Sequence, residues 1–184
     1  IRVYAQDASA YADYKVKVNV HTQRPDTFIW QSLTQANAKL AALNSMKAVS
    51  AGGKVVLFGK NAAGALEMFK SENGKQWEEI STTANLGNHA VDNIVAFDNA
   101  LYVLNPETHQ LLKSTDAAHW TLVGTFASLK QLIGAGSKNL YAYSGNDEGV
   151  TGISVSTDKG ASWTAEQLDA DAKYLPVSNI NTVS

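Results

Sequence analysis

The sequence predicts an all-β protein built from four-stranded propeller blades. The chain has 184 residues, and its four tryptophans are spaced 47, 43 and 43 residues apart. Each interval contains short apolar runs separated by glycine, asparagine, aspartate and serine. Such runs indicate strands, and four of them in about 43 residues indicate one propeller blade. We therefore expect three full blades, at residues 45–82, 88–125 and 129–168.

The first 24 residues do not follow this repeat. Residues 14–20 alternate apolar and polar side chains, which is typical of a strand with one apolar and one wet face. Residues 1–5 form a second candidate strand. Because an isolated hairpin is only marginally stable in water, we interpret residues 1–24 as the C-terminal hairpin of an immunoglobulin-like sandwich whose other strands lie upstream.

Residues 25–184 are predicted to form a partial propeller. Residues 28–33 resemble the outermost strand of a blade, and we expect them to close the ring by completing the last blade. The segment 35–43 is rich in residues that favour helix and predicts a short helix or loop. An incomplete blade is expected at 171–184. Three blades cannot close a ring, since propellers have about four to eight, so we expect a fragment.

A serine, followed two residues later by aspartate or asparagine, precedes three of the tryptophans. The Asp or Asn side chain can accept backbone N–H groups a few residues on, and glycine supplies the positive φ of a tight turn. We expect each tryptophan to pack as a wedge between neighbouring blades. The residues assigned to these structural turns are Ser71, Asn73, Gly74, Trp77, Ser114, Asp116, Trp120, Ser156, Asp158, Gly160 and Trp163.

This pattern resembles the Asp-box, or BNR, repeat, with the consensus Ser-x-Asp-x-Gly-x-Ser-Trp. Residues 156–163 fit this consensus in full. Residues 71–77 are one residue shorter than the consensus and have Asn in place of Asp. Residues 114–120 are also one residue shorter and lack the glycine. The resemblance covers residues 26–184 and implies a propeller. It implies little about activity, because Asp boxes lie on the blade periphery in sialidases, other hydrolases, sortilin-like receptors and bacterial surface propellers. With the sandwich–linker–propeller order, the chain resembles secreted or surface bacterial proteins, so an extracellular, periplasmic or cell-surface location is expected.

The composition excludes several classes of function. Without cysteine, the chain has no disulfide, cysteine nucleophile or thiolate metal site. A formal net charge of −2 and a pI of about 6.1 give no global attraction to nucleic acid. No apolar run approaches the ~18 residues of a transmembrane helix. The sequence indicates no cofactor, and its histidine spacing carries no metal signature.

Two hydrolase hypotheses follow from the resemblance. A sialidase would imply three arginines on inner strands, but the only arginines are Arg2 and Arg24, so this chain supplies none of them. The alternative function is a glycoside hydrolase-like propeller whose paired catalytic carboxylates lie partly outside this chain. Its candidate acids, each also typical of an exposed turn, are Asp92, Asp98, Glu107, Asp147 and Glu148.

The favoured interpretation is a non-catalytic extracellular binding or scaffold module for a glycan or protein ligand. Propellers present loops and inner strands around a shallow face that tolerates variation. The remaining partners expected are the other blades and the upstream sandwich domain, and we assign no catalytic residue. A purely structural role, with strand addition at the edge of residues 177–184, is a further hypothesis. The aromatic and histidine candidates, for which core or solvated roles are the simpler interpretation, are Tyr102, Tyr141, Tyr143, His89, His109 and His119.

Overall fold

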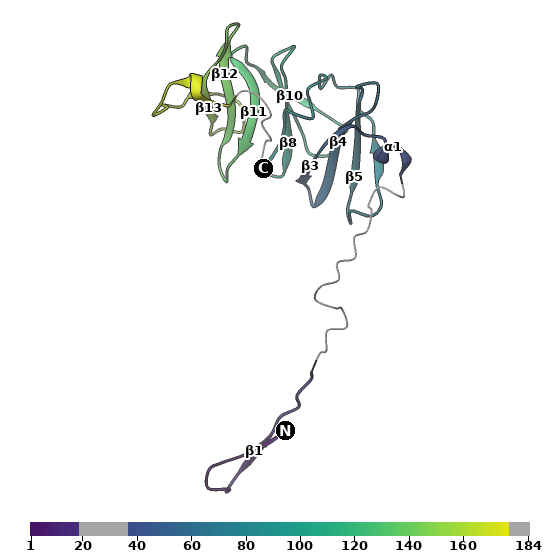
Figure 1. Ribbon diagram of the computed structural model, residues 1–184, viewed down its shortest axis with the longest axis vertical. Helices are drawn as coiled ribbons and strands as arrows, with labels where there is room; N and C mark the ends of the chain where they lie inside the picture. Colours follow the sequence, from purple (N-terminus) through teal and green to yellow (C-terminus); the bar gives the residue numbers. More distant parts are fainter. Residues whose placement is uncertain (19–36, 177–184) are drawn as a thin grey trace. The chain divides into compact units, whose positions relative to one another are not determined.

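The computed structural model describes residues 1–18 and 37–176 (Figure 1). The chain divides into two compact units, Ile1–Ser32 and Leu33–Ser184. The expected closing strand at 28–33 and residues 177–184 of the expected incomplete blade lie outside the described residues. Within the described part of the chain, no helix is long and apolar enough to cross a membrane.

Within residues 1–18, which are the described part of the first unit, the chain forms one antiparallel hairpin. Strand β1 (Arg2–Tyr4) pairs with β2 (Tyr11–Asp13), and the Tyr14 N–H extends the pairing by donating to the Ile1 carbonyl at 2.7 Å. The assignment of this hairpin to an immunoglobulin-like sandwich stays a prediction.

Residues 37–176, the described part of the second unit, form three four-stranded antiparallel sheets, each a simple meander in chain order. This confirms the predicted all-β class with repeated four-stranded sheets. Sheet 1 consists of β3 (Ser45–Ala51), β4 (Lys54–Lys60), β5 (Leu66–Ser71) and β6 (Glu78–Ile80). Sheet 2 consists of β7 (Ile94–Phe97), β8 (Ala100–Asn105), β9 (Gln110–Ser114) and β10 (Thr121–Thr125). Sheet 3 consists of β11 (Leu129–Ala135), β12 (Leu140–Asn146), β13 (Gly149–Ser156) and β14 (Thr164–Ala165).

Two short helices flank the sheets in the part of the chain that the structure describes. Helix α1 (Ala38–Ala41) lies within the segment predicted as helix or loop, and its N-cap Asn37 accepts the N–H groups of Lys39 and Leu40. Such caps satisfy backbone donors that a helix leaves free. Near the C-terminus, residues 171–176 contain the 3-10 helix η1 (Ala172–Tyr174) and no strand.

The sheets stand side by side in chain order, with their first strands adjacent (Figure 1). Strand β7 contacts both β3 and β11. Alternation along each strand divides its apolar residues between two layers: Phe58 of β4 faces sheet 2, whereas Leu57 faces the α1 side. In the same way, Val103 of β8 packs on sheet 1 and Leu104 packs on sheet 3.

Three apolar layers result from this alternation. One lies between sheets 1 and 2, a second between sheets 2 and 3, and a third joins the α1 segment to sheet 1. In the third layer, Leu40 and Leu43 cover Leu57, Phe69 and Trp77. Sheets 2 and 3 each pack one face against the sheet that precedes them. On sheet 1, helix α1 covers the corresponding face. Burying each large apolar side chain contributes roughly 1.5–3 kcal/mol.

Candidate functional site

Three turns of one design join the third and fourth strands of the sheets. We name residues 71–77, 114–120 and 156–163 the Ser-Trp turns; they hold all the residues that the sequence assigned to structural turns. The first serine of each is at most 3% exposed, and its hydroxyl oxygen accepts a backbone N–H at 2.8 or 2.9 Å. The donors are residues with positive φ, namely Gly74, Ala117 and Gly160.

A carboxylate or amide two residues after each serine closes the turn. Asn73, Asp116 and Asp158 each accept at least one backbone N–H at 2.8–3.0 Å. Hydrogen bonds from the ring and backbone of His119 hold the pKa of Asp116 well below its usual range. Those from the hydroxyl and backbone of Ser162 lower the pKa of Asp158 to about 2. Hydrogen bonds to the charged form of a carboxyl group favour that form. Both carboxylates are therefore ionised at neutral pH, and their hydrogen bonds stabilise the turns.

The tryptophans anchor the Ser-Trp turns to the apolar layers. Each indole N–H donates to a carbonyl of its own turn, at 2.7–3.2 Å. Trp120 lies edge-on to Phe58 with ring centroids 6.4 Å apart, and Trp163 lies edge-on to Phe126 at 6.3 Å. Trp77 packs in the layer beneath α1. Because the three indoles are half-buried against these layers, the turns pack onto the apolar layers rather than present free aromatic rings to a ligand.

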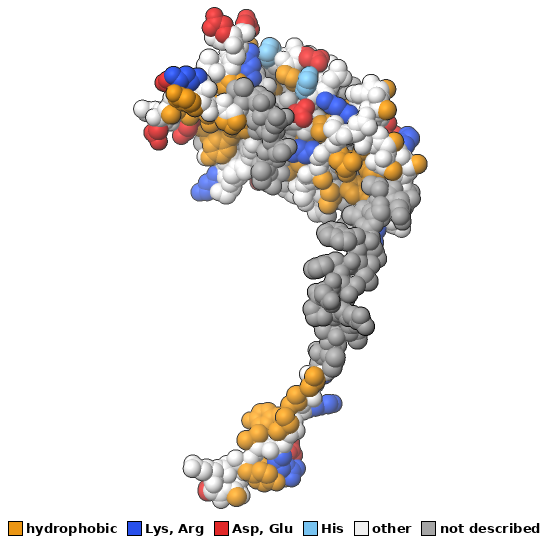
Figure 2. Space-filling model, viewed as in Figure 1, with side chains coloured by type: hydrophobic (Ala, Val, Ile, Leu, Met, Phe, Trp, Pro, Cys, Tyr) orange, Lys and Arg blue, Asp and Glu red, His pale blue; other side chains and the backbone are white. Residues whose placement is uncertain are grey.

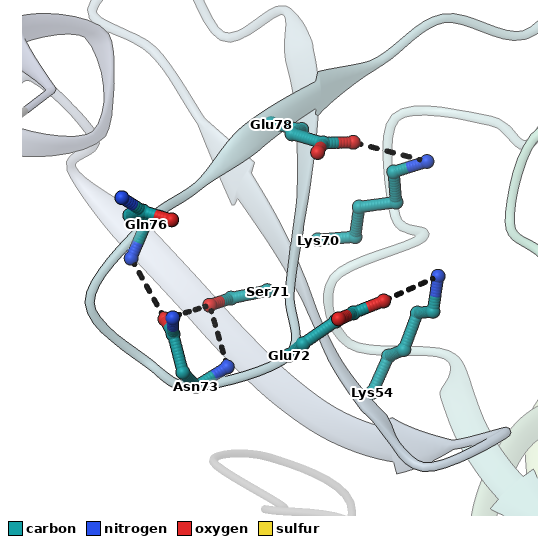
Figure 3. Close-up of a pocket in the computed structure, with 7 residues that line it drawn as sticks. All are labelled: Lys54, Lys70, Ser71, Glu72, Asn73, Gln76 and Glu78. Carbon is teal, nitrogen blue, oxygen red and sulfur yellow. Dashed lines mark hydrogen bonds and ion pairs between the residues drawn. The ribbon is translucent and has the colours of Figure 1, made fainter.

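A small polar hollow lies beside the first Ser-Trp turn (Figure 3). Two ion pairs lie along it, Lys54–Glu72 at 3.1 Å and Lys70–Glu78 at 3.3 Å. Its volume is about 100 Å³, whereas ligand pockets commonly measure ~300–1,000 Å³. The hollow is therefore too small, and its charges are already too well paired, to be the main ligand site.

A larger cleft lies between sheets 1 and 2, and we name it the intersheet cleft. Its volume is about 420 Å³, which falls within the usual ligand-pocket range of ~300–1,000 Å³. Strands β5 and β6, the linker at 81–88 and the turn between β8 and β9 supply its walls. Its apolar lining is Leu66, Met68, Ile80, Ala84 and Leu86. Its polar lining is Glu67, Glu79, Ser81, Thr82, Asn85, Asn88 and Glu107.

The carboxylates of the intersheet cleft differ in their partners. Glu79 binds the Lys39 ammonium with both oxygens, at 2.9 and 2.7 Å, and this contact raises the pKa of Lys39. Glu67 accepts from the Asn61 amide at 2.9 Å through one oxygen, while its other oxygen is buried without a partner. Glu107 is exposed on the β8–β9 turn.

One fully buried amide holds the two walls of the cleft together. The Asn105 side chain donates to the Asn85 carbonyl at 3.2 Å and accepts the Glu107 N–H at 3.0 Å. Gly87 has a φ of +74°, and a Cβ at this position would lie 2.9 Å from the Asn105 Oδ1. The linker can approach Asn105 so closely because residue 87 is glycine.

Polar side chains also connect the first strands of the three sheets, β3, β7 and β11. The Lys47 ammonium of β3 donates to the Ile94 carbonyl of β7 at 2.7 Å, and burial lowers the pKa of Lys47 to about 8. Asp92, just before β7, has its carboxylate 3.8 Å from the Lys60 ammonium. Its carbonyl accepts from the Gln131 amide of β11 at 3.4 Å. These contacts link all three sheets.

The candidate acids from the sequence do not gather into one site. Asp92 lies before β7, Asp98 pairs with Lys159 at 2.5 Å, and Glu107 lines the cleft. Asp98 and Glu107 occupy turns at opposite ends of β8. Asp147 and Glu148 are exposed in the β12–β13 turn.

The tyrosine and histidine candidates take separate places. Tyr102 is fully buried in the layer between sheets 2 and 3, and Tyr143 is 5% exposed with a pKa raised by burial. Tyr141 is half-buried. The ring of His119 contacts Asp116 at 2.7 Å, His89 lies 3.9 Å from Asp92, and His109 has a buried Nδ1 without a partner. Within residues 1–18 and 37–176, no three His, Cys, Asp or Glu side chains form a group that could hold a metal ion.

Sequence reasoning missed Glu67, Glu79 and Lys47. The one available signal was a charged residue between apolar neighbours within a strand, which describes Glu67 in β5 and Lys47 in β3. Glu79 gave no signal, because its partner Lys39 lies 40 residues away in the sequence.

Adjacent four-stranded meanders, joined face to face with their first strands as neighbours, define a β-propeller domain. The chain belongs to the DUF6242 beta propeller domain family, whose model matches residues 24–184. No curated protein matches the chain.

Proposed function

We propose that this propeller is a non-catalytic extracellular binding module that holds a glycan in the intersheet cleft. The observation that carries the proposal is the lining of the cleft, which combines an apolar floor with carboxylates, amides and hydroxyls. Sugars offer hydroxyl groups that donate and accept hydrogen bonds, together with apolar C–H faces. A mostly preformed cleft with a few placed polar groups is the usual form of a small-molecule site.

The partners of the lining residues support recognition over catalysis. Both oxygens of Glu79 are engaged by the Lys39 ammonium, so this carboxylate is already paired and is not free to act on a scissile bond. Paired-carboxylate hydrolysis needs one protonated and one ionised carboxyl group across the scissile bond. The carboxylates are better suited to accept hydrogen bonds from sugar hydroxyls.

We further assign the Ser-Trp turns to the Asp-box type. The Ser-x-Asp pattern, the buried serine hydroxyls and the inward-packed indoles support this assignment. The turns then serve to join blades, and ligand recognition falls to the clefts between them. The extracellular, periplasmic or cell-surface location rests on the resemblance to secreted Asp-box propellers.

The experiment is a thermal-shift screen of the whole chain against a panel of oligosaccharides, with reducing ends measured in the same wells. A ligand at 100 times its Kd stabilises by about 2.7 kcal/mol. At roughly 2–4 °C per kcal/mol, the Tm is expected to rise by about 5–10 °C. Reducing ends are expected to stay constant.

Matched variants locate the site. Glu107→Gln, which keeps the shape but removes a charge from the cleft, is expected to remove at least half of the Tm rise. Glu72→Gln, in the hollow of Figure 3, is expected to leave it unchanged. The proposal fails if no oligosaccharide raises the Tm, or if new reducing ends show that the hydrolase alternative is correct.

A further inference from the structure

The first Ser-Trp turn differs from the other two at the residue that closes it. This residue is Asn73, whereas Asp116 and Asp158 hold the same place in the second and third turns. Asn73 is followed by Gly74, and no other asparagine in the 184 residues precedes a glycine. An asparagine amide loses ammonia most readily before glycine, because glycine has no Cβ to hinder attack by its own backbone nitrogen.

The side-chain amide of Asn73 is presented for such an attack. Asn73 is exposed, so water reaches the amide and ammonia can leave it. Its Oδ1 accepts the Lys75 N–H at 2.8 Å and the Gln76 N–H at 3.0 Å (Figure 3). Donors aimed at this oxygen stabilise the negative charge that develops on it when a nucleophile adds to Cγ. The turn therefore favours the carbon that is attacked.

The nucleophile, in contrast, is held back by a buried serine. The Gly74 N–H donates to the Ser71 hydroxyl oxygen at 2.8 Å, and Ser71 is 3% exposed. The Gly74 nitrogen must lose this proton before it can bond to carbon, so the hydrogen bond has to open first. Local openings of this kind occur in native proteins and cost less free energy than global unfolding.

The first Ser-Trp turn is also the most loosely closed of the three. The serine hydroxyl lies 3.4 Å from the side-chain oxygen two residues later in this turn, 3.1 Å in the second turn and 2.8 Å in the third. Asn73 closes its turn as a neutral amide, whereas ionised carboxylates close the other two and make stronger hydrogen bonds. Opening is therefore easiest in the turn that holds the Asn-Gly pair.

We propose that Asn73 is a self-modification site, at which loss of ammonia gives the first Ser-Trp turn the carboxylate that the other two turns encode. The hydrogen bond to Ser71 delays the reaction until the turn opens. The Gly74 nitrogen then attacks Cγ of Asn73, the Cγ–Nδ2 bond breaks, and the proton of the Gly74 nitrogen leaves with the ammonia. A succinimide ring results. Water adds to Cγ and breaks the ring bond between Cγ and the nitrogen, which leaves an aspartate in an unchanged main chain.

The turn offers the aspartate product the bonds that hold the other two turns. A carboxylate at this place accepts the Lys75 and Gln76 N–H groups, as Asp116 accepts the two equivalent groups of the second turn. The neighbouring Glu72 and Glu78 are each paired with a lysine, so the new charge meets no unpaired carboxylate in the hollow beside it. On the face of the propeller seen in Figure 2, charges of both signs are interspersed.

The other way of opening the ring gives a product that does not fit. Water that adds to the backbone carbonyl carbon of Asn73 leaves an isoaspartate, whose main chain runs through Cβ and Cγ. The lengthened main chain moves the Gly74 N–H away from the Ser71 hydroxyl. This product is therefore expected to destabilise the turn, whereas the aspartate product stabilises it.

The test is peptide mapping of the 184-residue chain after long incubation at neutral pH, with the mass gained when an amide becomes a carboxyl group as the readout. We expect this gain at residue 73, at least tenfold faster in urea than in the folded chain. In urea, residue 73 is expected to convert faster than any other asparagine. No gain at residue 73, or equal rates in urea and in the folded chain, overturns the proposal.

Matched variants separate opening of the turn from loss of the fold. Ser71→Ala removes the acceptor of the Gly74 N–H and is expected to speed the conversion in the folded chain at least fivefold. Ser114→Ala makes the same change in the second turn and is expected to leave the rate at residue 73 unchanged. Equal acceleration in the two variants means that global unfolding controls the reaction, and the proposal is then wrong.

The substitution Asn73→Asp tests whether the turn accepts the product. We expect its urea midpoint to lie above that of the wild-type chain, because the carboxylate makes charge-assisted hydrogen bonds. A midpoint below the wild-type value contradicts the fit of a carboxylate to this turn.

Discussion

The substitution Ser156→Ala tests the Ser-Trp turns most sharply. Ser156 is 1% exposed, and its hydroxyl accepts the buried Gly160 N–H at 2.8 Å while donating to Asp158 at 2.8 Å. Alanine leaves the Gly160 N–H buried without a partner, which costs roughly 1–3 kcal/mol. We expect the free energy of unfolding to fall by about 2 kcal/mol. For a unit of this size, the corresponding fall in Tm is about 4–8 °C.

Ser162→Ala is the matched control for this prediction. Its hydroxyl bonds the same Asp158 carboxylate, but Ser162 is exposed, so water replaces the lost bond. The expected change lies within about 0.5 kcal/mol. Urea denaturation monitored by tryptophan fluorescence gives both values. Equal losses in the two variants would refute the argument that the cost arises from leaving the buried Gly160 N–H without a partner.

Three further predictions concern the partners of Ser156 in the same Ser-Trp turn and the half-buried Lys47. Gly160→Ala places a Cβ 2.7 Å from Leu111 at a φ of +90°, and its unfolding free energy should fall by about 2–3 kcal/mol. Gly64→Ala, at a φ of +77° in open space, should cost only about 1 kcal/mol by the same urea assay. Because the pKa of Lys47 is about 8 in the fold and 10.5 as its ordinary value, the unfolded state binds more protons between these pH values. Stability should therefore rise with pH across this window relative to Lys47→Met, measured by urea midpoints at pH 7.5, 9 and 10. Since the pKa of Asp158 falls from 3.8 to about 2 on folding, its contribution is present above pH 3.8 and is lost as the pH falls through about 2. Acid titration of Asp158→Asn should show a smaller loss over that range than the wild-type protein, and an equal loss contradicts the assignment.

The fold could be predicted from the sequence because its determinants are local. The spacing of Trp77, Trp120 and Trp163 reflects one strand–turn–strand unit, and the alternation around each turn reports which residues face a layer. Because the turn of a hairpin sets the register of its two strands, a repeated hairpin pattern predicts a repeated sheet. The role of helix α1 was not predictable, because covering Leu57 and Phe69 depends on how the segment returns over sheet 1.

The candidate site was less accessible to sequence reasoning. Glu107 was identified only as one of several acids, while Glu67 and Glu79 join it through the stacking of two sheets. The contact between Lys47 and the Ile94 carbonyl likewise spans 47 residues and depends on β3 and β7 being neighbours. These groups of side chains come together only when neighbouring sheets pack. The spacing of residues within one repeat therefore cannot predict them.

We propose that this propeller recognises a glycan in the intersheet cleft without cleaving it. The most direct measurement is a calorimetric titration with the oligosaccharide that raises the Tm most, followed by chromatography of the recovered sugar. We predict saturable binding, at least tenfold weaker in Glu107→Gln than in Glu72→Gln, and recovery of the intact oligosaccharide. Binding that both variants retain equally, or recovery of shorter sugars, would overturn the proposed glycan recognition in the intersheet cleft.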